Sequence, residues 1–100
     1  MHIAWEDLQT VEALVRVGTI AGAGRELGLR HTSVSRRVDA LERALQLPLF
    51  LREARLEPTA LARELASRAA RMAKEANDVA ALVEDARRQR ERRLVVTTND

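Results

Sequence analysis

Cysteine and tyrosine are absent from the 100-residue sequence, and Trp5 and Phe50 are its only aromatic residues. Without cysteine the chain can form no disulfide, no thiolate metal site and no cysteine nucleophile. With so few aromatic rings, the core must be built mainly from aliphatic side chains. No apolar run approaches the ~20 residues that span a bilayer, and the N-terminus lacks the basic start and apolar stretch of a signal peptide. We therefore expect a soluble cytoplasmic protein with no membrane contact.

A strong excess of one charge is also lacking, since 17 Lys and Arg against 15 Asp and Glu give a net charge of +2. This balance is poor evidence for a nucleic-acid partner, and a high arginine content can reflect genome composition alone. The placement of the arginines is more informative. Residues 30–37 hold three arginines and no acid, and residues 87–93 hold five arginines and one acid. Hydrophobic and charged fractions of 46% and 32% indicate a globular domain and exclude a disordered chain.

Apolar residues spaced by three and four predict three short helices, over residues 6–17, 20–27 and 31–45. Gly18 is placed to end the first helix in a left-handed conformation, and Thr19 is placed to cap the second. Pro48 should stop the third. Small residues at positions 21–24 suit the close approach of another helix, which is the arrangement in a helix-turn-helix.

The segment after the third helix is short, apolar and turn-bounded. We expect residues 47–51 to pack beneath the three helices and residues 50–58 to form a small two-stranded wing. No glycine or asparagine marks the tip of this wing.

Thr59 is placed to cap a long fourth helix that reaches Ala86 or extends to Arg93. Such a helix would be about 50 Å long, too long to fold back onto a domain of this size. Apolar residues recur in a heptad pattern, which predicts a dimer formed by two copies of this helix. The predicted dimer interface consists of Leu65, Ala69, Met72, Ala76, Val79 and Val83. Residues 94–98 are rich in β-branched side chains and predict a strand that would open a further domain.

The start of the third helix carries the candidate functional residues. A helix-turn-helix protein places its second helix in the major groove, with the N-terminal residues of that helix against base edges. Hydroxyl, imidazole and guanidinium groups can bind bases and phosphates. The candidates are Arg30, His31, Thr32, Ser33, Ser35, Arg36 and Arg37. The alternative is a polar turn that only solvates the start of a helix.

Three runs of the sequence together resemble the LysR-type bacterial transcriptional regulators. They are TIAGAGREL at 19–27, VSRRVDALE at 34–42, and Leu49-Phe50 followed by Arg52. The resemblance extends from residue 6 to about residue 90. It implies a mainly α fold with a winged helix-turn-helix DNA-binding domain over 1–58 and a linker and dimerisation helix over 59–93. Residues 94–100 would then be the start of a truncated effector-binding domain.

The resemblance also implies roles for single residues. Ser35 and Arg36 match a Ser-Arg pair that grips DNA, and His31 and Thr32 occupy positions that contact bases. Arg52 matches an arginine that follows Leu-Phe, and Arg55 becomes the wing residue that reaches the minor groove. The implied function is a regulator that binds double-stranded DNA as a homodimer or higher oligomer at an interrupted palindrome. A small-molecule effector would act only through the missing domain.

Departures from the family pattern limit this transfer. His31 replaces the usual glutamine, so the base preference does not carry over. Arg30 stands where a serine cap is common, which costs about 1 kcal/mol of helix stability. Pro58 and Ala62 replace a leucine and a glycine, which leaves the wing geometry open.

Other function classes find less support. An enzyme, a metal site and a cofactor are unexpected, because the sequence has only two histidines, no cysteine and no Gly-rich phosphate loop. Asp39 and Glu42 lie three residues apart on one helix, where we expect pairing with Arg36 and Arg43 rather than a catalytic dyad. The main competitor is a helical protein-interaction module with little DNA specificity of its own.

Overall fold

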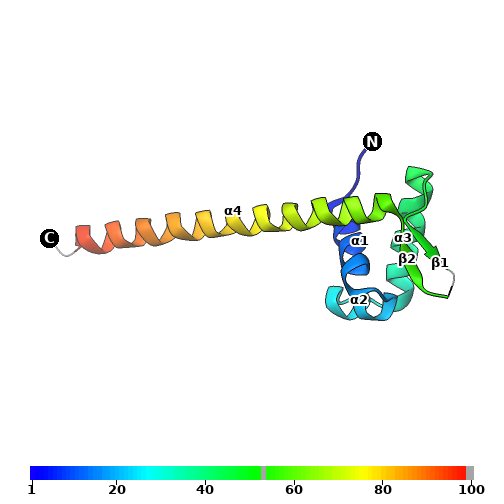
Figure 1. Cartoon of the computed structure of the whole chain (residues 1–100). Helices are drawn as coiled ribbons and strands as arrows, with labels where there is room; N and C mark the ends of the chain where they lie inside the picture. Colours follow the sequence, from blue (N-terminus) through cyan, green and yellow to red (C-terminus); the bar gives the residue numbers. More distant parts are fainter. Residues whose placement is uncertain (53, 99–100) are drawn as a thin grey trace. The chain divides into compact units, whose positions relative to one another are not determined.

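Three helices form the N-terminal part of the chain in the computed structural model, which describes the backbone of residues 1–52 and 54–98. They are α1 (Trp5–Val17), α2 (Ile20–Leu27) and α3 (His31–Leu45), as the sequence predicts (Figure 1). Gly18 ends α1 in the left-handed conformation, with φ of 87°. The Thr19 hydroxyl caps α2 by accepting a hydrogen bond from the N–H of Gly22 at 3.0 Å. Both predicted helix-boundary signals are therefore confirmed.

A small aliphatic core joins these helices. It combines residues of all three helices with the segment before the first strand and the start of α4 (Ala60–Thr98). Its buried members are Val11, Ala13, Leu14, Ala23, Val34, Val38, Leu41, Leu49, Phe50 and Ala62. Phe50 is the single aromatic ring among them, so the expectation of a mainly aliphatic core is confirmed.

Gly24 lets α2 approach the turn that leads into α3. A Cβ at this position would lie 2.7 Å from the carbonyl oxygen of Leu29 and 3.6 Å from Cγ2 of Val34. The Leu29 N–H also donates to the Gly24 carbonyl at 2.8 Å. The small residues of α2 thus serve the close packing of a helix-turn-helix, and at Gly24 backbone itself is the near neighbour.

The wing consists of two short strands, β1 (Phe50–Arg52) and β2 (Leu56–Pro58), which pair antiparallel. Phe50 lies opposite Pro58, and Arg52 lies opposite Leu56. The prediction that residues 47–51 pack beneath the helices is only half right. Leu49 and Phe50 are buried, but Leu47 and Leu51 are 53% and 51% exposed. The pleat explains Leu51, since successive side chains of a strand point to opposite faces.

α4 begins where the sequence predicts and ends later. The Thr59 hydroxyl accepts from the N–H of Ala62 at 3.3 Å, which confirms Thr59 as the cap. The predicted strand over residues 94–98 is wrong, because α4 continues to Thr98. A lone strand has no neighbouring edge to bind, whereas a continued helix pairs each N–H with the carbonyl four residues back.

The chain divides into two units, Met1–Ala70 and Arg71–Asp100. The first unit holds the three short helices, the wing and the start of α4. The described part of the second unit is helix alone, and nearly all of its described side chains are exposed. None of the described helices is long and apolar enough to cross a membrane.

Candidate nucleic-acid interface

The start of α3 presents the predicted contact residues at the surface of the first unit. Arg30 is the N-cap residue, with φ of −73° and ψ of 153°, and no side chain caps the helix. The free N–H groups of the first turn are therefore left for water or a ligand. The exposed side chains are Arg30, His31, Thr32 and Arg36, and the half-buried ones are Ser33, Ser35 and Arg37. The buried side of the same helix carries Val34, Val38 and Leu41.

Two surface depressions gather these residues into groups. One is lined by Leu29, Ser33, Arg36, Arg37 and Ala40 on the outer side of α3. The other lies between the start of α2 and the wing, where Thr19, His31 and Arg55 share one lining. The structure thus brings the wing residue Arg55 to the same groove as His31. Thr19 was not predicted for this site, because its capping role accounts for its place in the sequence and no spacing links it to the wing.

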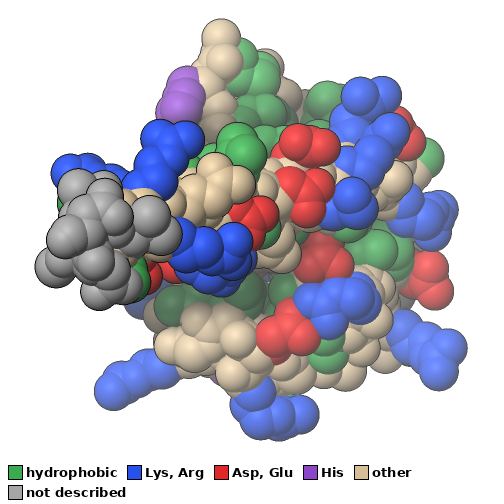
Figure 2. All heavy atoms as spheres, turned by 90° about the vertical axis from the view of Figure 1, so that its left-hand side faces the viewer, with side chains coloured by type: hydrophobic (Ala, Val, Ile, Leu, Met, Phe, Trp, Pro, Cys, Tyr) green, Lys and Arg blue, Asp and Glu red, His purple; other side chains and the backbone are tan. Residues whose placement is uncertain are grey.

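Charge at the start of α3 is not compensated within the described residues. The first turn of α3 has no acid, and the ion pairs found in the described part of the chain leave out Arg30, Arg36 and Arg37. Elsewhere the surface is of mixed sign. In the view of Figure 2, Lys and Arg side chains protrude at several separate points, and Asp and Glu side chains lie among them. Arg25, Arg43 and Arg55 are likewise absent from the described ion pairs, so what distinguishes the start of α3 is that three arginines and no acid lie within residues 30–37.

Arg52 is bound differently from the other candidate arginines. Its Nη2 lies 2.7 Å from Oδ1 of Asp39 and 3.6 Å from Oε1 of Glu42. The predicted pairing of Asp39 and Glu42 with Arg36 and Arg43 is therefore wrong. The reason is that the wing strand runs beside α3, so a residue distant in sequence reaches these carboxylates. Arg52 sits with the wing's attachment to α3 and not with the start of that helix.

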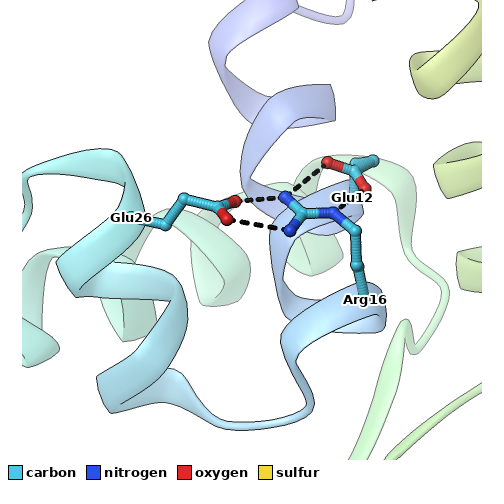
Figure 3. Close-up of polar contacts among 3 residues, drawn as sticks. All are labelled: Glu12, Arg16 and Glu26. Carbon is cyan, nitrogen blue, oxygen red and sulfur yellow. Dashed lines mark hydrogen bonds and ion pairs between the residues drawn. The ribbon is translucent and has the colours of Figure 1, made fainter.

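A second ion-pair cluster joins α1 to α2 (Figure 3). The guanidinium of Arg16 binds the carboxylates of Glu26 and Glu12, with Nη1 2.8 Å from Oε1 of Glu26 and Nε 2.7 Å from Oε2 of Glu12. These hydrogen bonds raise the pKa of Arg16, and the Arg16 guanidinium lowers the pKa of Glu26. The cluster is exposed and fixes α2, whose N-terminal end lines the groove with His31.

The predicted dimer interface does not form one open stripe. Ala69 is 1% exposed and is therefore closed to a second chain, and Leu65 is partly buried against the core of the first unit. The first turns of α4 pack against the core of the N-terminal domain. In the second unit, by contrast, Met72, Val79 and Val83 are 46%, 57% and 47% exposed, and Ala76 is exposed with them. An available apolar stripe thus begins after Ala70.

Among the described residues, no group of three or more His, Cys, Asp or Glu side chains is arranged to hold a metal ion.

A comparison with known protein families gives a match over residues 5–63. The family described as "Bacterial regulatory helix-turn-helix protein, lysR family" covers this range. A curated relative, the HTH-type transcriptional regulator AbaB of Streptomyces antibioticus, is 44% identical over 64 residues. Those residues are 63% of this chain and 21% of that protein, so the chain spans about a fifth of the relative's length.

Solved structures with a similar fold include DNA complexes and longer proteins. The structure of a CbnR_DBD–DNA complex is 25% identical, with a TM-score of 0.72 over 84% of this chain and 98% of that one. Full-length LTTR LysG from Corynebacterium glutamicum is 25% identical, with a TM-score of 0.76 over 83% of this chain and 29% of that one. The similarity therefore covers nearly all of the CbnR_DBD chain and about three tenths of the LysG chain.

Proposed function

Since the chain belongs to the lysR family of bacterial regulatory helix-turn-helix proteins, whose members are DNA-binding transcriptional regulators, we propose that α3 enters the major groove of double-stranded DNA and reads its sequence. Residues 1–58 act as the DNA-binding domain in this proposal. The wing lies against the neighbouring backbone and minor groove.

A single observation carries the proposal: the guanidinium groups at the start of α3 face outward, and no ion pair compensates them within the described part of the chain. Desolvated, unpaired cations are costly within a protein, but at the surface they are available to phosphates. A solvated helix cap needs no such cluster. The similar CbnR_DBD was solved in complex with DNA, and that complex supports the same role for this chain.

Position on α3 divides the proposed contacts by role. His31, Thr32, Ser33 and Ser35 lie in the first turns, where side chains of a recognition helix reach base edges. Arg36 and Arg37 share the outer depression with Ser33 and can bind phosphates or read guanine. Arg30 precedes the helix and is suited to a phosphate. Arg55 is the proposed minor-groove contact, while Arg52 is left out because two carboxylates already bind its guanidinium.

We also propose that the chain acts as a homodimer on an interrupted palindrome. Support comes from the exposed apolar residues Met72, Val79 and Val83, which recur at heptad spacing on α4. Ala69 is left out of this interface because it is buried in the first unit, and Leu65 is only partly available to it. Residues 59–93 then serve as the linker helix, residues 94–100 lead toward an effector-binding domain, and any small-molecule effector acts through that domain in the cytoplasm.

The proposed function is tested by titrating a mixed-sequence duplex against the chain at several salt concentrations. Arg36→Ala should weaken binding and reduce the slope of log K against log[salt] by about one unit, because one phosphate contact is lost. Arg43→Ala is the matched control, since Arg43 is exposed near the other end of α3. If both variants bind the duplex like the wild type, α3 does not contact DNA and the protein-interaction module becomes the better account.

A further inference from the structure

Glu42 holds the beginning of the wing to α3 through two backbone groups. Its Oε2 accepts hydrogen bonds from the N–H of Leu49 at 2.7 Å and from the N–H of Phe50 at 3.2 Å. Leu49 is fully buried and Phe50 is 5% exposed, so both residues are fixed in the core as well. A carboxylate that accepts backbone N–H groups makes stronger hydrogen bonds than a neutral acceptor would.

An ion pair between Arg52 and Asp39 adds a second attachment, at the other end of β1. The guanidinium of Arg52, at the last position of β1, lies between Asp39 and Glu42, which are on successive turns of α3. The Glu42 side chain is 21% exposed and the Asp39 side chain is 40% exposed. β1 is therefore bound to α3 at both ends, by Glu42 at Phe50 and by both carboxylates at Arg52.

The other side of the same segment is tied to the start of α4. The Leu49 carbonyl accepts from the N–H of Thr59 at 2.9 Å and from its hydroxyl at 3.2 Å. The Thr59 hydroxyl also caps α4. β1 is thus fixed against α3 on one side and is anchored by the cap of α4 on the other, so the wing has little freedom to shift along α3.

We propose that Glu42 and Arg52 are positioning residues, which set the distance between the base-contacting start of α3 and the wing so that both fit one DNA site. This inference rests on the proposed DNA-binding function. Glu42 lies six residues beyond Arg36 on the same rigid helix, about 9 Å along its axis. A wing bound to α3 at that point keeps a fixed position relative to the recognition residues. DNA binding then loses less free energy to ordering the wing.

Charge argues that this arrangement serves geometry and not simple attraction to DNA. Asp39 and Glu42 bring two negative charges to a helix that is proposed to lie beside phosphates, and Arg52 compensates only one of them. Two carboxylates at such a place weaken non-specific binding. If they position the wing, their benefit appears as a higher ratio of affinity for a fitting sequence to affinity for any other sequence.

The test compares two duplex probes with each variant of the full chain. The specific probe is the duplex that the wild type enriches most from a random-sequence pool, and the non-specific probe is a mixed-sequence duplex of equal length. Glu42→Gln and Arg52→Gln should each lower the ratio of specific to non-specific affinity about three- to tenfold, as expected when charge-assisted hydrogen bonds are replaced by neutral ones. The double variant should be no worse than either single one, because the two residues act as a unit.

Glu6→Gln is the matched control, because Glu6 is an exposed carboxylate on α1 that lines neither depression of the proposed interface and holds no wing attachment in the described structure. It should leave the ratio unchanged. Circular dichroism at the assay temperature checks that every variant is folded. A purely stabilising role would lower the unfolding temperature of the Glu42 and Arg52 variants without moving the ratio.

Three outcomes would overturn the inference. A ratio unchanged in both single variants removes the positioning role alone. If Arg52 bound phosphate directly, Arg52→Gln would weaken both probes equally while Glu42→Gln strengthened both. If the wild type enriches no duplex, the proposed function fails, and the positioning role fails with it.

Discussion

At the start of α3, an arginine stands where a capping side chain would stabilise the helix. Arg30 stands at the N-cap and its side chain gives no cap hydrogen bond, whereas Thr19 caps α2. A missing cap costs about 1 kcal/mol. The sequence predicts this cost, and it also predicts which residues start the helix. It does not predict the partners of Asp39 and Glu42, because Arg52 reaches them only after the wing has folded beside α3.

The Arg16–Glu26 pair makes stability depend on pH. The pKa of Glu26 is lowered from its ordinary value of 4.5 by the Arg16 guanidinium. Its stabilising effect is therefore complete above the ordinary pKa and is lost as the pH falls through the lowered one. We predict that Glu26→Gln unfolds at a lower temperature than the wild type at neutral pH. The difference should shrink as the pH falls below 4.5 and vanish once it has passed the lowered pKa of Glu26, in thermal unfolding followed by circular dichroism.

Glu57→Gln serves as the reference for this pH series, because it removes the same charge from an exposed position on the wing. A Glu26→Gln deficit that persists at the acid end would mean that the ion pair is not its source.

Helix boundaries are the part of the fold that local chemistry determines best. α2 and α3 match their predicted bounds. Thr19 and Gly28 lie at the two ends of α2, and α3 ends at Leu45, where Gln46 takes the left-handed conformation two residues before Pro48. Residues 94–98 show where local chemistry is insufficient. Their β-branched side chains favour a strand, but a strand needs a neighbour, and α4 continues instead. The exposure of Leu51 and the burial of Ala69 likewise depend on which elements pack together.

Gly24 tests how closely α2 must approach the turn before α3. Gly24→Ala should destabilise the protein by about 1–3 kcal/mol, because its Cβ meets the Leu29 backbone and overpacks the core. Gly22→Ala should destabilise as well, but through α1 and the cap of α2, because its Cβ would overlap Cγ1 of Val17 and lie 2.8 Å from the Thr19 hydroxyl. Urea unfolding measures both, and a Gly24→Ala variant as stable as the wild type would show that the helices have room to separate.

At the scale of the whole molecule, the proposed function depends on a second copy of the chain. The DNA-binding unit folds around its own core, whereas the apolar residues of α4 beyond Ala70 remain exposed. The sequence predicts the long helix and its heptad pattern. It does not predict that Ala69 is buried in the first unit or that Leu65 packs partly against its core, because both depend on how the helices pack.

The most direct test of the central claim is selection of duplexes from a random-sequence pool by the full chain, followed by sequencing of the bound fraction. Two copies of α3 held as a dimer should enrich an inverted repeat with an unread centre, its half-sites a whole number of helical turns apart. Val79→Glu, which places a charge in the apolar stripe, should enrich a single half-site or bind more weakly. A bound pool with no enriched sequence would contradict the proposal that α3 reads DNA.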